Sequence, residues 1–363
     1  MKLLVQPGDG IMPLVKAIDN AKKSVEIVIF RFDRNEVEQA LARAVSRGVF
    51  VHALIAYTNR GGEANLRKLE MRMLAAGITV ARTADDLARY HYKFMIIDRA
   101  EFYLLAFNYT FLDIEHSRSF GVITTNRRMV QEAVKLFEAD TKRQQYTPGL
   151  PNLVVSPINA RKQLAAFIKG ARKELLIYDP EVSDPGMIRI LEERAGAGVA
   201  IKLIGKLTRR SARFSARKLA HMRLHTRTII RDGEYAFLGS QSLREIELEK
   251  RRELGLIFRD RKAVKHMAKV FEEDWAVTEK VAAGRDEPAR PASKVAKKLA
   301  KAVAKELPPV APMLEVIVKE AGGTPEFSMP AREVEETVKQ AVKEAVREAV
   351  KDVVEQVSEH NGH

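Results

Sequence analysis

The chain repeats itself, and this internal duplication limits its possible folds more than any other feature. Two pairs of runs match at the same offset of 150 residues: residues 21–29 with 171–177, and residues 48–55 with 198–204. In each copy a helical pattern leads into an apolar run, a second helical pattern, a Gly-Val turn and a second apolar run. Self-similarity at a fixed offset indicates two copies of one structural unit. We therefore predict two similar halves, at residues 1–147 and 148–280.

The apolar runs in both copies are continuous and rich in β-branched residues, as in Val25–Ile29 and Leu175–Ile177. Runs of this kind are typical of parallel strands that helices cover on both faces. The fold class predicted for each half is therefore α/β. With 363 residues, of which 46% are hydrophobic, the chain is long enough to bury a large core.

The composition changes at about residue 281. A polar, proline-containing stretch with one short Ala/Lys-rich helix is predicted for residues 281–330. A long amphipathic helix is predicted for residues 331–358, where a narrow Ala/Val stripe runs along one face. Because that stripe has no Trp, Phe or Leu, self-association or docking is favoured over a helix that lies in a membrane surface.

Charge and cysteine content restrict the partners and the chemistry. The formal net charge is +14, and Lys202–Arg231 contains ten basic residues and no acidic residue. Such a run favours a polyanionic partner, either an anionic phospholipid, nucleic acid or another phosphate ester; a solvated basic surface is the alternative. The absence of cysteine excludes disulfides, thiolate nucleophiles and cysteine-based zinc sites. Without a signal peptide or transmembrane pattern, we expect a cytoplasmic protein, with peripheral membrane contact as the alternative.

A second duplicated element carries residues suited to catalysis. Its copies, 134 residues apart, are His91-x-Lys93-x-x-x-x-Asp98 and His225-x-Arg227-x-x-x-x-Asp232. Residues two apart on a strand share a face, so each histidine and its basic neighbour are expected to project together. One copy alone is a weak signal, and a buried structural histidine is the alternative at either position. Two copies within a wider duplication are far more specific.

These paired motifs resemble those of the phospholipase D superfamily, and the resemblance covers roughly Val5–Val277. It implies two α/β sandwich halves that pack face to face about a pseudo-twofold axis, followed here by a C-terminal helical tail. Each half is then expected to contribute one motif to a single site.

The residues that flank the motifs depart from the family pattern. Members usually have Gly-Ser-x-Asn shortly after the motif Asp, and then an acid before an apolar strand. The second half keeps the Gly-Ser pair, with Ser240, and the acid, Glu253; the first half keeps Asn108 but has Ser119 in place of the acid. The resemblance implies that Asn108, Ser240 and Glu253 contact the substrate. The losses are compatible with two specialised halves or with a degenerate site.

The resemblance also implies a mechanism. One histidine forms a covalent phosphohistidine, the other protonates the leaving group, and water or an alcohol resolves the intermediate. We assign His91 as the nucleophile because its motif is intact, and His225 as the acid; the reverse assignment stays open. Lys93 and Arg227 are expected to hold the phosphate oxygens.

By the same resemblance, Asp98 and Asp232 are expected to accept hydrogen bonds from the imidazoles and so to set their tautomers and orientation. No carboxylate cluster in the sequence suggests a metal site, and the mechanism needs no metal or other cofactor.

The predicted activity is that of a phosphodiesterase or phosphatidyltransferase that acts on phospholipids, similar to phospholipase D or cardiolipin synthase. The basic run at Lys206–Arg223 is expected to line the site entrance, and Phe214 is its one aromatic residue. Because binding of single-stranded nucleic acid relies on stacking against aromatic residues, a phospholipid is favoured. The alternatives are a nuclease of the same superfamily and a degenerate, non-catalytic scaffold that binds phosphate or anionic lipid.

Overall fold

The computed structural model describes residues 1–59, 63–208, 211, 213–219 and 222–280. They belong to one compact unit, Met1–Gly284, which contains both predicted halves. The predicted linker at 281–330 and the long helix at 331–358 lie outside the described residues, so self-association through that helix stays a prediction. Within the described part of the chain, no helix is long and apolar enough to cross a membrane.

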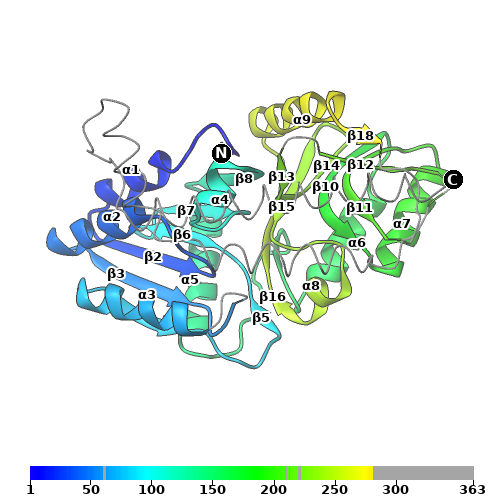
Figure 1. Ribbon diagram of the computed structural model, residues 1–363. Coiled ribbons are helices and arrows are strands. Elements are labelled where there is room, and N and C mark those ends of the chain that lie inside the picture. The colour runs from blue at the N-terminus through cyan, green and yellow to red at the C-terminus, as the bar shows by residue number, and fades with distance from the viewer. Residues whose placement is uncertain (60–62, 209–210, 212, 220–221, 281–363) are drawn as a thin grey trace, which may run out of the picture. The chain divides into compact units, whose positions relative to one another are not determined.

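The first half is built on a mixed sheet (Figure 1). Its strands, in spatial order, are β1 (Lys2–Gln6), β8 (Ser117–Thr124), β7 (Glu101–Leu105), β6 (Phe94–Ile97), β2 (Ser24–Ile29), β3 (Phe50–Ile55) and β4 (Thr79–Arg82). Its helices are α1 (Met12–Asn20), α2 (Asn35–Ser46), α3 (Glu63–Ala75), α4 (Phe111–Glu115) and α5 (Arg127–Thr141). As predicted, the apolar strands β2 and β3 pair in parallel, and all six residues of β2 are buried.

The second half repeats this order strand for strand. Its strands are β9 (Leu153–Val155), β17 (Leu254–Phe258), β15 (Tyr235–Gly239), β14 (Arg227–Arg231), β10 (Glu174–Val182), β11 (Ala200–Leu207), β12 (Ala216–Lys218) and the additional β18 (Glu279–Lys280). Its helices are α6 (Ala160–Lys169), α7 (Pro185–Gly196), α8 (Glu245–Glu249) and α9 (Arg261–Ala276). The duplication and the α/β fold class are thus confirmed.

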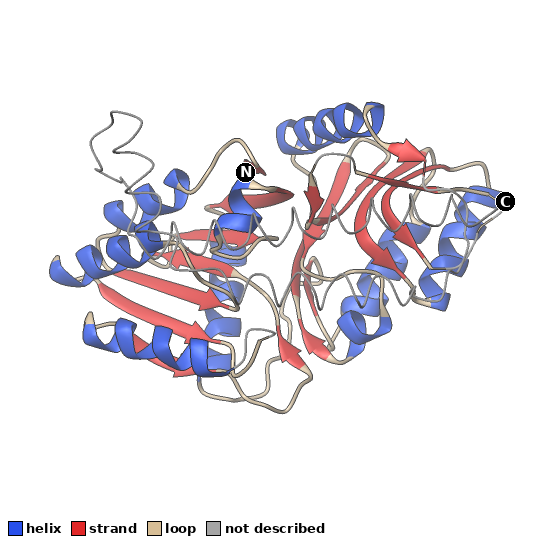
Figure 2. Cartoon of the chain, viewed as in Figure 1, coloured by secondary structure: helices blue, strands red, loops and turns tan. Residues whose placement is uncertain are grey.

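Helices and sheets alternate in layers (Figure 2). One hydrophobic cluster joins residues of α1, α2 and α3 to one face of the first sheet, and another joins α6 and α7 to the second sheet. A third cluster contains residues of both sheets together with α5 and α9, for example Phe94, Phe137, Leu238 and Phe271. The two halves therefore share a single core where they meet.

Two short strand pairs also join the halves, and they obey the same symmetry. Strand β13 (Arg223–Leu224) of the second half pairs in parallel with β8 of the first. Strand β16 (Arg251–Arg252) pairs in parallel with β5 (Arg89–Tyr90), which precedes the first motif. In both cases the backbone of one half reaches the segment next to a motif histidine of the other.

Buried ion pairs reinforce this contact. Arg118 of β8 contacts both carboxylate oxygens of Asp274 in α9, at 2.7 and 3.0 Å. In the symmetric arrangement, Arg252 of β16 donates to Asp140 in α5, at 3.1 Å. The two arginines are 134 residues apart, as are the two aspartates. Each pair joins one half to the other.

The motif aspartates accept hydrogen bonds from backbone N–H groups and not from the imidazoles, so the predicted role of Asp98 and Asp232 in setting the tautomers was wrong. The Asp98 carboxylate accepts hydrogen bonds from the backbone N–H groups of Lys22, Lys23 and Ser24. The physical reason is distance: a strand rises about 3.3 Å per residue, so β6 places Asp98 at its far end from His91. These hydrogen bonds hold the pKa of Asp98 below its ordinary value, although burial acts to raise it.

Asp232 repeats this arrangement in the second half. Its carboxylate accepts from the backbone N–H groups of Arg172, Lys173 and Glu174. Both aspartates have a left-handed backbone, with φ of 53° for Asp98 and 56° for Asp232, a conformation that Asp tolerates better than most residues.

We predict that Arg252→Met lowers the free energy of unfolding by about 3–5 kcal/mol, because it leaves the buried Asp140 carboxylate without its cation. Lys202→Met is the control: it removes an exposed pair with Glu272, and a loss of about 0–1 kcal/mol is expected. Chemical denaturation of both variants checks this. Equal losses would contradict the role given to the buried pair.

We predict that Asp98→Asn lowers the free energy of unfolding by about 1–3 kcal/mol at neutral pH, because backbone donors lose a charged acceptor. Since the folded pKa is depressed, this contribution is present above the unfolded pKa and is lost as pH falls through the folded value. The difference between variant and wild type should therefore shrink in acid. Unchanged stability together with altered catalysis would restore the imidazole role.

Candidate active site

His91 is held by a carboxylate from the other half. Its backbone N–H donates to the carbonyl of Arg252 at 2.8 Å, which continues the pairing of β5 with β16. The next residue, Glu253, therefore stands beside His91, and its Oε2 lies 2.9 Å from His91 Nδ1. In the structure Glu253 contacts the imidazole, because the strand register places it there, and its predicted contact with the substrate stays a prediction.

Lys93 faces the other side of the same imidazole. Its Nζ lies 3.1 Å from His91 Nε2 and also donates to the His91 carbonyl oxygen. When Lys93 is in its ammonium form, which has donors only, Nε2 accepts, and the ring proton is assigned to Nδ1, facing Glu253. The ring of Phe30 packs against His91 with a centroid distance of 4.5 Å. The expected projection of His91 and Lys93 to one side is confirmed.

His225 has a different setting. Its backbone N–H donates to the carbonyl of Arg118 at 3.1 Å, which mirrors the contact of His91 with Arg252. Its Nε2 lies 3.4 Å from Oδ2 of Asp113, on helix α4 of the first half. Its Nδ1 is buried and, among the described residues, has no hydrogen-bond partner. Each histidine thus has a carboxylate from the opposite half, but on a different ring nitrogen.

Arg227 occupies the place of Lys93 in the second half. Its Nη1 donates to the carbonyl oxygen of His225 at 2.7 Å, as Lys93 does to that of His91. Its Nε donates to the hydroxyl of Ser242 at 3.2 Å and lies 3.8 Å from Glu247 Oε2. The guanidinium therefore keeps the position of the cation and gains two further partners.

The two other residues predicted to contact substrate have internal partners. Asn108 donates its side-chain amide to Asp113, while its Oδ1 is buried and unpaired within the described residues. The hydroxyl of Ser240 donates to the carbonyl of Leu254 at 3.3 Å and accepts from the N–H of Leu254 at 3.1 Å. Contact of Asn108 and Ser240 with a substrate stays a prediction.

The two motif histidines and Lys93 are almost closed to solvent, and this governs their titration. Lys93 is fully buried, His91 is 9% exposed and His225 is 5% exposed. Burial lowers the pKa of both histidines well below the ordinary value and that of Lys93 to about 7. Lys93 and Arg227 add to the lowering at both imidazoles. The charges of the two motifs therefore act on one another, as a composite site requires.

Sequence reasoning missed two carboxylates, Asp113 and Glu247. Asp113 accepts from the backbone N–H of Asn108 at 2.8 Å, and Glu247 accepts from that of Ser242 at 2.7 Å. Both acids follow their partner by five residues and are 134 residues apart, so the repeat itself contained the signal. Their shared task is to fix the loop that follows β7 or β15.

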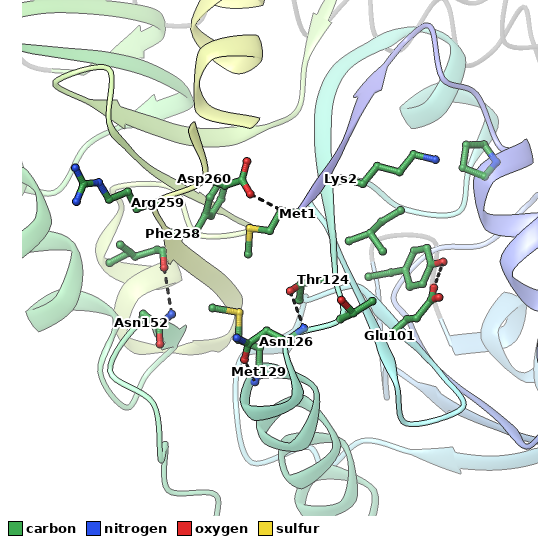
Figure 3. Close-up of a pocket in the computed structure, with 15 residues that line it drawn as sticks. Met1, Lys2, Glu101, Thr124, Asn126, Met129, Asn152, Phe258, Arg259 and Asp260 are labelled. Atoms are coloured by element: carbon green, nitrogen blue, oxygen red, sulfur yellow. Dashed lines mark hydrogen bonds and ion pairs between the residues drawn. The ribbon is translucent and has the colours of Figure 1, made fainter. Parts of the chain in front are cut away.

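Two features of the surface bear on substrate entry. Of the basic run at 206–223, Arg223 reaches the site, where its Nη1 binds Asp113 and Ser117. Arg217 instead covers the ring of Trp275 at 4.0 Å. A pocket of about 820 Å³ opens elsewhere, between β7, the start of α5 and the start of α9, and no motif residue lines it (Figure 3).

The fold has relatives among solved structures. A phosphatidylserine synthase from Haemophilus influenzae Rd KW20 matches with a TM-score of 0.63 and 12% identity, over 84% of this chain and 93% of that one. A polyphosphate kinase from Porphyromonas gingivalis matches with a TM-score of 0.63 and 20% identity, over 76% of this chain. The chain spans 50% of the length of that kinase. At these identities the likeness establishes the fold alone. No curated protein sequence matches the chain.

The sequence also matches a family model, described as cardiolipin synthase, PLD-like domain, over residues 14–141 and 164–275. These ranges contain both motifs and most of each half. The chain therefore belongs to the family of phospholipase D-like domains typified by cardiolipin synthase, within the phospholipase D superfamily.

Proposed function

We propose that the protein is a metal-independent phosphodiesterase or phosphatidyltransferase that acts on phospholipids through a phosphohistidine on His91. Superfamily members are mostly phosphotransferases or phosphodiesterases, which supports an enzyme of this general kind. The observation that carries the proposal is the unequal setting of the two imidazoles.

That inequality gives each histidine a role. Glu253 holds the proton of His91 on Nδ1, so the lone pair is on Nε2. Lys93 donates to that lone pair in the free protein and releases it when its ammonium group binds a phosphate oxygen. Asp113 Oδ2 lies 3.4 Å from Nε2 of His225, and a carboxylate at this place favours a proton on that nitrogen. One ring thus offers a nucleophile and the other an acid, which is the pair that cleavage of a phosphodiester needs.

The reaction then balances in two steps. His91 Nε2 attacks phosphorus, the P–N bond forms and the bond to the leaving oxygen breaks. The imidazolium form of His225 turns its Nε2 proton from Asp113 to that oxygen and is left as the neutral ring with its proton on Nδ1. Water or an alcohol next attacks phosphorus, its proton returns to His225 Nε2, and the P–N bond breaks. Lys93 and Arg227 stabilise the non-bridging oxygens during both steps.

A phospholipid substrate is supported by the family description, cardiolipin synthase, and by the basic composition of the first 280 residues. Arg223, which contacts Asp113, brings a cation of the basic run to the reacting groups. A nuclease and a non-catalytic scaffold are the outcomes against which this proposal is tested.

We predict that purified protein with a chelator cleaves or transesterifies anionic phospholipid in vesicles and that this requires both histidines. His91→Ala should abolish the covalent adduct, because it removes the nucleophile. His225→Ala should slow turnover by about 10²–10⁴-fold, as expected for the loss of an acid. The adduct is detected by acid-free quenching and mass spectrometry of the peptide that contains His91.

The same assay also tests the two alternative functions, a nuclease and a non-catalytic scaffold. Single-stranded and double-stranded DNA are offered in parallel, and turnover of DNA alone would make the protein a nuclease. Salt-sensitive binding to anionic vesicles without turnover of any diester would make it a scaffold. A phosphorylated His225 in wild-type protein would reverse the two roles.

We predict that Arg227→Lys lowers the rate of an active site built around the guanidinium, because lysine has no second nitrogen to replace the separate contacts of Nη1 with the His225 carbonyl and of Nε with Ser242. The fold should be unchanged, as judged by circular dichroism and thermal unfolding. The conservative control is Lys93→Arg, which tests whether the first half is equally selective. A rate that rises from near zero in Arg227→Lys would identify the natural site as degenerate.

A further inference from the structure

The first half has lost the acid that the second half provides. Pairing of β8 with β13 places Ser119 beside His225, as pairing of β16 with β5 places Glu253 beside His91. Serine is too short to reproduce the carboxylate. The Ser119 hydroxyl and His225 Nδ1 are both buried, and neither has a hydrogen-bond partner among the described residues. Ser119 therefore does not orient the ring of His225 as Glu253 orients that of His91.

A carboxylate reaches the opposite nitrogen instead. Asp113 Oδ2 lies 3.4 Å from His225 Nε2, and Asp113 is 3% exposed. The backbone and side-chain amides of Asn108 donate to the same oxygen, and Arg223 donates to the other. These three hydrogen bonds, together with the helix that carries Asp113, leave its carboxylate little freedom to turn away from the imidazole.

We propose that Asp113 is a positioning residue that holds the imidazole of His225 with its proton on Nε2, in place of the carboxylate lost at Ser119. This rests on the proposed role of His225 as the acid. Asp113 acts through His225 and takes no part in bond making at phosphorus. Its counterpart Glu247 contacts Arg227 and fixes a loop, so the two equivalent acids have different tasks.

The charges around His225 give the direction of the effect. Facing it are Asp113 from α4, Arg223 from β13, Arg227 from β14, and Lys93 from the first motif. Burial and the three cations lower the pKa of His225, and Asp113 opposes them. Although burial acts to raise the pKa of Asp113, His225, Arg223 and the amide donors hold it well below its ordinary value. Asp113 is thus ionised throughout the neutral range.

The test compares Asp113→Asn with Glu247→Gln, each of which removes the charge that anchors a loop. In Asp113→Asn we expect kcat to fall by about 10–100-fold, less than for loss of the acid itself. Because the acid must be protonated, a lower His225 pKa moves the alkaline limb of the kcat profile to lower pH. Glu247→Gln should lower the rate through Arg227 and leave that limb in place.

A second readout needs no turnover. Nitrogen-15 NMR of labelled histidine reports which ring nitrogen carries the proton in the free protein. Wild-type His225 should be protonated on Nε2, and Asp113→Asn should lose that tautomer while His91 keeps its own. Adding Ser119→Glu to Asp113→Asn should return the alkaline limb toward the wild-type pH, because it restores a negative charge from the side of Nδ1.

The outcomes separate this inference from the proposed function. A tautomer change without turnover of any diester by wild-type protein would support the positioning role and overturn the catalytic one. Turnover with an unchanged His225 tautomer and pH profile in Asp113→Asn would overturn the positioning role alone. The same shift of the limb in Glu247→Gln would show a loop effect and would also overturn it.

Discussion

The site depends on a reciprocal exchange of backbone hydrogen bonds between the halves. The backbone N–H of His91 donates to the carbonyl of Arg252, and that of His225 donates to the carbonyl of Arg118. Each histidine is therefore fixed by a strand of the other half. Everything else at the site follows from that register. It sets which residue stands beside each ring, brings the two cations together and draws both histidines out of water. The buried Arg–Asp pairs and the shared core hold the exchange in place.

Symmetry in the backbone contrasts with asymmetry in the side chains. The strand order, the inter-half pairs, the turn aspartates and the loop acids all repeat. The partners of the two imidazoles do not, because Glu253 meets Nδ1 of one ring and Asp113 meets Nε2 of the other. In a symmetric pair of rings only the bound substrate would divide nucleophile from acid. Here the difference is present before any substrate enters.

The sequence alone predicted the fold well and the site in part. The duplication, the α/β class, the parallel pair β2 and β3 and the common face of His91 and Lys93 were correct, because each follows from local period and offset. The role predicted for Asp98 was wrong, because the extended strand between His91 and Asp98 carries the aspartate away from the imidazole. The contacts of Glu253 and Asp113 depend on pairing between halves, which no spacing within one half reveals. The repeated acids five residues after Asn108 and Ser242 were visible but had no meaning without that pairing.

Joining both halves in one chain also changes how the site can diverge. In an assembly of two identical subunits, any substitution would be made twice, so losing one carboxylate would remove both. A fused duplicate escapes that restriction: one copy has serine at position 119 while the other keeps its glutamate at 253. Substitutions can then accumulate separately in each half, provided that the other half still supplies the catalytic or positioning group that was lost. Neither half is therefore a miniature of the whole, and cutting the chain between them would separate every histidine from its carboxylate.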